Sequence, residues 1–385
     1  MKTLFKITAM MLITSLPVQS QIKDIFKKSY DATNLKNLVL DLEGTFVEIG
    51  ASDDNKVHFD YTIEFENYSS KEIDKILKVI KPESQIVNDK LEFKSKGNNI
   101  SGDVTYSIET LYGITFEGDY INFKEPTTKM FRKSKQYFLE INSSSRGKSL
   151  KEYLKNLREV DDKGEKRKIN SKHVKILRTN FTIKIPSHLN IRLMAVNSNM
   201  TFKLDLEGQI NVNARNTDLK FQSIQNPLNN FDIVNGSFRS NTLNRGSYRF
   251  THVDEVQIAE IKNLTIDSEF STTKIGEIGE DVKIVDFNSK FWIHNFSNDF
   301  GTFIMNTEYS EINLFYPEEI DYYIETFGHD TFHNVGFTSA DVPPSRKNES
   351  SKMMVIGEET SPNKIQINSV HGIIRFAEDF IEIEE

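Results

Sequence analysis

The sequence predicts a mainly β protein whose C-terminal half is a β-solenoid, a stack of short coils wound about one axis. Three observations favour this fold. Apolar residues recur in two registers every 17–21 residues or so, asparagines recur at one place in the repeat, and residues 189–337 lack helical periodicity. Two short strands per coil cannot bury their own apolar faces, so neighbouring coils must stack to form a core.

The two registers run in step through eight cycles. The first contains Leu193, Val212, Ile233, Phe250, Ile266, Ile284, Ile304 and Ile324, and the second contains Phe202, Phe221, Ser240, Ile258, Ile275, Ile293, Ile312 and Phe332. In most coils a further inward residue follows the second marker by three positions: Ile224, Leu243, Ile261, Ile278, Phe296 and Val335. A β-sandwich with strands at similar intervals is the alternative fold.

Asparagines mark the expected corners of the coils. Asn197, Asn216, Asn235 and Asn288 each lie five positions before the second marker. Asparagine tolerates the left-handed backbone that a tight corner requires, and its amide can hydrogen-bond to its own turn.

Residues 1–20 have the pattern of a secretory signal peptide. Lys2 and Lys6 precede a mostly apolar run over 7–18, which is too short to span a bilayer. A buried N-terminal helix is the alternative. No later window is apolar enough to span a membrane, so we expect an exported chain that is periplasmic, on the cell surface or secreted. Because the sequence has no cysteine, neither disulfides nor a lipid anchor on an N-terminal cysteine is expected.

Residues 21–118 are predicted to form a β-rich region with one short helix. Runs over 38–42, 46–49 and 57–63 alternate between apolar and polar residues, as half-buried strands do. Ser69 and Glu72 have the spacing of a capping box, which starts a helix that Pro82 ends.

Residues 119–172 form a basic, partly helical insertion. They hold 15 Lys or Arg against 8 Asp or Glu, whereas residues 189–385 hold 16 against 30. A second capping-box pattern predicts a helix over 149–160, and we expect it to cover the first coil near Ile191 and Leu193. Residues 161–168 lack apolar side chains and are predicted to be a solvated loop.

The predicted solenoid covers residues 173–337. Residues 338–362 contain Pro343 and Pro344 in a polar stretch and are predicted to be a projecting loop. Residues 363–385 are expected to supply one last coil and an acidic tail.

The strands over 37–49, the segment over 183–191 and the ending over 363–376 resemble the bacterial "putative adhesin" family of exported β-solenoids of unknown function. The resemblance covers roughly residues 35–118 and 173–376, and residues 119–172 depart from it. It rests on apolar spacing rather than on fixed catalytic residues. The resemblance implies an exported solenoid and supplies no site residue.

No catalytic residue, metal ligand or cofactor is predicted. The expected register places His294, Asn313 and His333 at one outward position in successive coils, too far apart for both histidines to bind one zinc ion. His329 and His333 have a helical metal spacing on what is predicted to be a strand and its turn. We therefore expect His294, His329 and His333 to be solvated.

One outward row offers candidate ligand-binding residues. It is predicted to contain Thr201, Lys220, Arg239, Gln257, Lys274, Trp292, Glu311 and Thr331. Lys220, Arg239 and Lys274, beside the chain's only tryptophan, Trp292, suit an acidic sugar through charge and ring stacking. An ordinary exposed sheet face is the alternative interpretation.

The sequence therefore favours a non-enzymatic, exported β-solenoid that serves as an adhesion, scaffold or surface-binding module. Its expected partner is a cell-envelope or extracellular surface component, either glycan or protein. The net charge of −8 argues against nucleic acid. The alternative function is glycan binding or polysaccharide cleavage through the row of Lys220, Arg239, Lys274 and Trp292.

Overall fold

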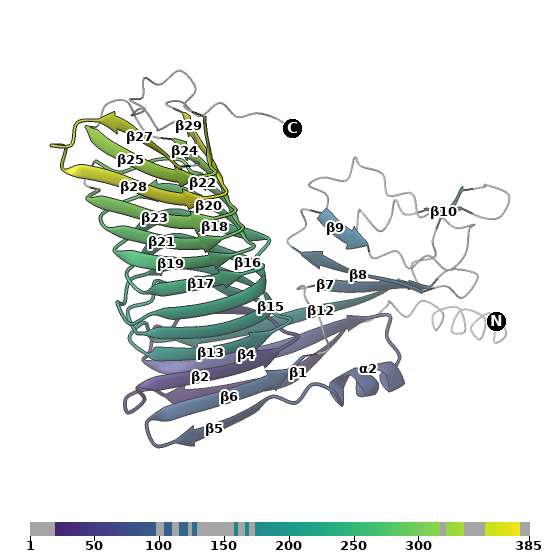
Figure 1. The fold of residues 1–385 in the computed structure, drawn as a ribbon. Coiled ribbons are helices and arrows are strands. Elements are labelled where there is room, and N and C mark those ends of the chain that lie inside the picture. Colours follow the sequence, from purple (N-terminus) through teal and green to yellow (C-terminus); the bar gives the residue numbers. More distant parts are fainter. Residues whose placement is uncertain are drawn as a thin grey trace, which may run out of the picture.

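Figure 1 shows the fold of the protein as a computed structural model. The structure describes residues 20–97, 104–109, 115–121, 125–128, 158–160, 166–168, 174–298, 300–315, 321–334 and 351–377. Within these ranges the protein is mainly β, with a single helix, and all strands but two belong to one open sheet.

The N-terminal region forms the first layers of the sheet. Its elements are β1 (Gln21–Asp31), β2 (Asn37–Glu43), β3 (Phe46–Ala51), β4 (Lys56–Glu66), α2 (Ser70–Leu77), β5 (Glu83–Val87) and β6 (Lys90–Lys96). The Ser69 side chain accepts a hydrogen bond from the backbone N–H of Glu72, and the Glu72 carboxylate accepts one from the N–H of Ser69. The predicted helix start is confirmed.

Three strands pair beside these layers, where Figure 1 shows them extending to one side of the stack. They are β7 (Val104–Glu109), β8 (Thr115–Ile121) and β12 (Val174–Ile185), and β9 (Glu125–Thr128) pairs with β8. β12 is antiparallel to both β4 and β7 and parallel to β3. It therefore joins the side sheet to the first layers.

From residue 190 onward the chain adds layers of two strands each, stacked as Figure 1 shows. The first strand series comprises β13 (Asn190–Val196), β17 (Ser247–Thr251), β19 (Leu264–Glu269), β21 (Val282–Phe287) and β23 (Thr302–Glu308). The second comprises β14 (Asn199–Phe202), β18 (Glu255–Lys262), β20 (Thr272–Ile278), β22 (Lys290–Ile293) and β24 (Glu311–Phe315). β15 (Ile210–Ile224) and β16 (Asn230–Asn244) each run through both series. Every strand in a series is parallel to the strand of the next layer.

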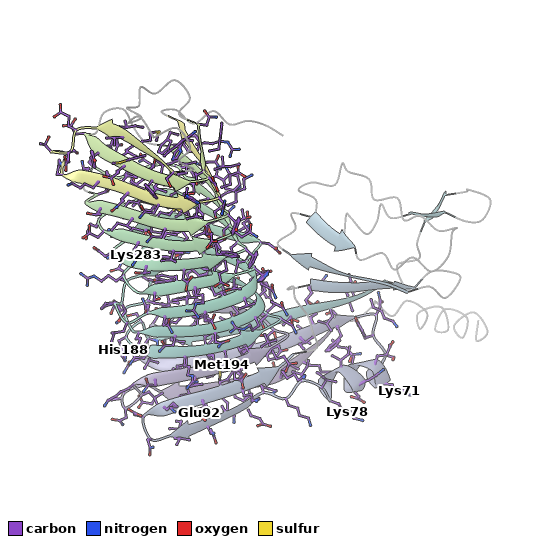
Figure 2. The ribbon with its side chains drawn as sticks, in the orientation of Figure 1. Lys71, Lys78, Glu92, His188, Met194 and Lys283 are labelled. Atoms are coloured by element: carbon purple, nitrogen blue, oxygen red, sulfur yellow. The ribbon has the colours of Figure 1, made fainter. Side chains whose placement is uncertain are left out.

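Apolar side chains from the two series meet in one core. The ring centres of Phe221, from the second series, and Phe231, from the first, lie 5.5 Å apart. Phe238 and Phe250 repeat this contact one layer on, at 5.2 Å. All four residues are almost completely buried. Side chains such as Lys283 project from the outer surface along the stack (Figure 2).

The predicted register is confirmed for most of the second series. Phe221 is opposite Ser240, Ser240 opposite Ile258, Ile258 opposite Ile275, and Ile275 opposite Ile293. In the first series, the pairs Leu193–Val212, Ile233–Phe250 and Ile266–Ile284 are also confirmed.

Other predicted pairs are displaced. Val212 is opposite Phe231 rather than Ile233, Phe250 opposite Ser268 rather than Ile266, and Ile293 opposite Leu314 rather than Ile312. Each is a shift of two residues, which keeps the same side chains pointing inward, so an apolar pattern of period two cannot detect it. Ile284 is opposite Met305 rather than Ile304, a shift of one residue. Phe303, Ile304 and Met305 are all apolar, so the sequence pattern does not distinguish which of them faces Ile284.

At the C-terminal end, the order in space differs from the order in sequence. β28 (Asn363–Val370) lies between β23 and β25 (Tyr322–His329), and β29 (Ile373–Ala377) lies between β24 and β26 (Phe332–Asn334). The segment that was expected to form the last coil therefore lies between the layer of β23 and β24 and the layer of β25 and β26, although it follows both in the sequence. The predicted pairing of Ile304 with Ile324 is wrong, and Phe332, predicted to point inward, is exposed.

The predicted projecting loop is wrong over residues 351–357. They form β27 (Ser351–Gly357), which is antiparallel to β25. Met354 of this strand is buried against the core, whereas Met353 is exposed. Residues 338–350 of the predicted loop lie outside the described residues.

The predicted cap of the first coil is also corrected. Ile191 and Leu193 of β13 lie opposite Leu38 and Leu40 of β2, so the N-terminal layers occupy the place assigned to the basic insertion. Residues 158–160 are not helical: β10 (Arg158–Val160) pairs with β11 (Lys166–Lys168), which also replaces part of the predicted solvated loop. Residues 149–157 lie outside the described residues.

Candidate functional site

The predicted row of outward side chains is continuous on the second strand series. Lys220 is opposite Arg239, Arg239 opposite Gln257, Gln257 opposite Lys274, and Lys274 opposite Trp292. Strands within a sheet lie about 4.8 Å apart, so the row from Lys220 to Trp292 extends about 19 Å. Because the three basic side chains are exposed, they are available to a ligand in solution.

Beyond Trp292 the row continues differently from the prediction. Its next members are Asn313 and Arg375, instead of Glu311 and Thr331. Glu311 lies in the adjacent row, where it forms ion pairs with Arg375 and, at 3.5 Å, with Lys290. The two-residue shift at Ile293 and the insertion of β29 cause this difference.

Trp292 is flanked by two ammonium groups. The Nζ atom of Lys290 lies 4.5 Å from the centre of the indole ring, and that of Lys274 lies 5.7 Å from it. Both distances fall within the range of cation–π attraction. The predicted row did not include Lys290, because the row takes only one position from each coil. Lys290 precedes Trp292 by two positions on the same strand, and alternation places both on one face.

The charges along the row are not all balanced. Arg239 pairs with Glu255 at 2.5 Å. Within the described ranges, no carboxylate lies within ion-pairing distance of Lys220 or Lys274. These two lysines give the face a local positive charge although the chain as a whole is acidic.

The corner between the two strand series is a second feature of this surface. Asn197, Asn216, Asn235 and Asn288 adopt positive φ angles of 50–59°, which confirms the predicted corners. The Asn216 amide donates to Asn197 at 3.2 Å, and the Asn235 amide donates to Asn216 at 3.0 Å. Asn197, Asn216 and Asn235 thus form a hydrogen-bonded ladder along three successive layers.

Further along, aromatic residues take over the same corner position. His252, Phe270, Tyr309 and His371 have φ angles of 50–57°. The rings of His252 and Phe270 stack at 4.8 Å, and those of Tyr309 and His371 stack at 5.0 Å. Phe287, next to the corner, contacts Phe270 and Tyr309 edge to face at 5.4 and 5.8 Å. We call these five residues the aromatic corner.

Stability alone favours asparagine over phenylalanine or tyrosine at these corners. An aromatic pair and a hydrogen bond each contribute about 0.5–1.5 kcal/mol, so the two kinds of ladder gain similar amounts. The left-handed conformation costs a residue other than glycine or asparagine about 1–2 kcal/mol. Phe270 and Tyr309 are also 43% and 51% exposed, so their burial recovers little of that cost.

A hollow of about 410 Å³ opens beside the aromatic corner, on the side of the second strand series. Phe270 and Tyr309 line it together with Asn288, which stands between them at the corner. Its polar lining includes Thr272, Lys290 and Glu311. Lys290 connects the hollow with Trp292, so the hollow and the basic row form one continuous surface.

The histidine predictions need correction. His294 and His333 do not share a row with Asn313, whose neighbours are Trp292 and Arg375. Both histidines are half-buried, and burial lowers the pKa of each, with a further lowering by Lys274 at His294 and by Lys352 at His333. In the part of the chain that the structure describes, no three His, Asp or Glu side chains gather where they could hold a metal ion.

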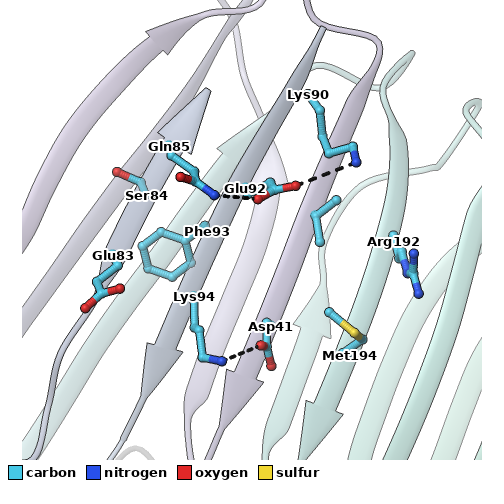
Figure 3. A pocket seen from close by; sticks show the side chains of 11 residues that line it. Asp41, Glu83, Ser84, Gln85, Lys90, Glu92, Phe93, Lys94, Arg192 and Met194 are labelled. Carbon is cyan, nitrogen blue, oxygen red and sulfur yellow. Dashed lines mark hydrogen bonds and ion pairs between the residues drawn. The ribbon is translucent and has the colours of Figure 1, made fainter. Parts of the chain in front are cut away.

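Another hollow, of about 470 Å³, lies between β5, β6, β2 and β13 (Figure 3). The charged groups lining it mostly satisfy one another. Glu92 contacts Gln85 at 2.8 Å and Lys90 at 3.6 Å, and Lys94 pairs with Asp41 at 3.0 Å. This hollow is therefore a weaker candidate than the surface around Trp292.

Comparisons with known proteins add little to this description. The sequence matches no family profile and no curated protein. One solved structure, described as a putative cell adhesion protein from Clostridium sporogenes, is 10% identical, with 94% of this chain and 100% of that chain covered and a TM-score of 0.17. Another, a putative lipid binding protein from Parabacteroides distasonis, is 9% identical, with 94% and 97% covered and a TM-score of 0.26. At such TM-scores neither likeness carries an argument.

Proposed function

We propose that this protein is an exported, non-enzymatic β-solenoid that binds an anionic component of the cell envelope or of an extracellular surface. Lys220, Arg239 and Lys274 attract the ligand, and Trp292 provides a flat apolar contact. The observation that carries the proposal is the register that places these side chains in one row, with Lys274 and Lys290 beside the indole ring.

The solenoid interpretation rests on the pairing of the strands. Both strand series advance by one parallel layer at a time, and left-handed corner residues connect them in every layer from Asn197 to His371. Such a stack exposes a long face with regular spacing, which suits repetitive ligands.

A binding role is supported by the exposure of the row. Catalytic groups usually lie in concave sites that exclude water. Lys220, Arg239 and Lys274 instead extend from the surface of a sheet. An alternative, cleavage of an acidic polysaccharide, would use the same residues and is an outcome of the test below.

Export is proposed from the sequence of residues 1–20, which lie almost wholly outside the described residues. Among the residues described, no helix is both long and apolar enough to cross a membrane.

The test is a binding assay on the purified mature protein with an array of glycans and with isolated envelope fractions. Lys220→Glu with Lys274→Glu should abolish binding to acidic components. Lys283→Glu with Lys364→Glu is the matched control, because it changes the net charge equally on the first strand series. Binding that survives the first pair, or falls equally with the second, contradicts the proposal. Release of shortened or unsaturated oligosaccharides would establish cleavage instead.

A further inference from the structure

The backbone of the corner does not explain why aromatic residues occupy it. The backbone is held in the same way at six corners, those of Asn197, His252, Phe270, Asn288, Tyr309 and His371. The N–H of each corner residue donates to a carbonyl of the next layer, as in Asn197 to Arg215 at 3.0 Å and Phe270 to Phe287 at 3.0 Å. Asparagine and aromatic residues thus occupy equivalent positions. The fold accepts asparagine there, so the rings of Phe270 and Tyr309 are not required by the corner itself.

Backbone strain and exposure of the rings coincide at these two positions. Strained residues that the surrounding structure maintains are often found at functional sites. An exposed apolar row flanked by polar groups is likewise typical of an interaction surface. Both observations are separate from the basic row, and both point to the corner near Asn288.

The form and chemistry of the hollow indicate the class of ligand. Each of Phe270 and Tyr309 uses one face to stack on a histidine, which leaves its other face directed towards the layer of Asn288. Phe287 fills this layer from the first strand series, and the hollow remains on the other side. Aromatic side chains in the lining can pack against the C–H faces of a sugar ring. The amide of Asn288, the hydroxyl of Thr272 and the charged groups of Lys290 and Glu311 can hydrogen-bond to its hydroxyls.

We infer that the aromatic corner and its hollow bind sugar rings of a polysaccharide whose acidic groups contact the basic row. The inference rests on the proposed function, since it names the ligand class of the same surface. From His252 to His371 the corner spans five layers, or about 19 Å. This length, together with the basic row beside it, fits a chain of several sugars better than a single one.

The experiment compares two polymers with the same sugar ring, polygalacturonate and its carboxyl-reduced form, and adds alginate as a second acidic chain. Binding is measured by calorimetry and thermal stability by circular dichroism. Phe270→Asn with Tyr309→Asn introduces the residue that occupies the corner in other layers. We expect it to weaken binding of an acidic polymer at least tenfold while the melting temperature stays the same or rises. Val196→Asn with Ile86→Asn, which also removes exposed apolar side chains, should leave affinity unchanged.

The outcomes separate the two proposals. If the Lys220→Glu, Lys274→Glu pair abolishes binding and the Phe270→Asn, Tyr309→Asn pair does not, the inference about the corner is wrong and the proposed function stands. If neither pair alters affinity, both are wrong. If the wild type binds neither acidic polymer, the inference about the corner is wrong, while the proposed function is decided by the glycan array and the envelope fractions. A wild-type dimer in light scattering that the corner pair converts to a monomer would identify the aromatic corner as a contact between two copies, which contradicts the inference.

Discussion

The Nζ atom of Lys274 lies 5.7 Å from the indole ring of Trp292, which belongs to the next layer, while the adjacent Ile275 is fully buried beneath Ile293. Two neighbours in sequence therefore have opposite environments. The same strand that contributes to the core also positions the candidate site, so the register controls both.

This relationship gives a direct test of the register. Ile275→Asp places an unpaired charge in the core and should destabilise the protein by about 3–5 kcal/mol. Lys274→Asp should cost about 1 kcal/mol or less, since it changes an exposed residue and one cation–π contact. Denaturant titration followed by circular dichroism measures both. Equal costs would mean that the register is wrong.

A second matched pair tests the C-terminal end. Met354 is 2% exposed and its neighbour Met353 is 36% exposed, as expected for a strand that covers the last layer. Met354→Asp should lower the melting temperature strongly, whereas Met353→Asp should have little effect. If residues 351–357 were a solvated loop, the two variants would be equally stable.

The corner ladder makes a prediction about backbone conformation. Asn216→Ala should destabilise the protein by about 1–2 kcal/mol, because alanine is strained at a positive φ. It also loses the amide hydrogen bonds to Asn197 and Asn235. Asn216→Gly avoids the strain and should cost less than alanine. Chemical denaturation of the three proteins gives the order, and a glycine variant less stable than the alanine variant would refute this account of the corner.

Asp286 makes stability depend on pH. It is 5% exposed, accepts a hydrogen bond from Thr307 at 2.9 Å, and has its pKa raised above the ordinary 3.8 by burial. With a raised folded-state pKa, its stabilising contribution is complete below the ordinary pKa and is lost as pH rises through the folded-state value. Asp286→Asn should therefore gain stability over the wild type as pH rises from acidic to alkaline. A difference in melting temperature that is independent of pH would contradict this assignment.

The sequence predicts the parts of the fold that depend on alternation and on local turns. The inward direction of Phe221, Ile258 and Ile275, the asparagine corners and the capping box at Ser69 all follow from patterns within a few residues. The row from Lys220 to Trp292 could be predicted because the second strand series keeps a constant register over that range.

The remaining features depend on contacts between distant segments. The insertion of β28 between β23 and β25 leaves no local signal, since all three strands have similar alternation. The aromatic corner lacks a local signal for a different reason: large apolar residues such as Phe270 and Tyr309 are usually buried, and only their left-handed backbone turns the rings outward. The cap of β13 by β2 joins segments about 150 residues apart, as the pairing of Asn190 with Asn37 shows.

Because Trp292 is the only tryptophan in the chain, its fluorescence reports on the candidate site without any label. Titration with polygalacturonate at low salt should shift or quench this emission, with a midpoint equal to the calorimetric Kd. The change should weaken as salt screens the lysines and should disappear in the Lys220→Glu, Lys274→Glu variant. Tight binding by calorimetry with an unchanged Trp292 emission would place the ligand elsewhere on the protein and contradict the account.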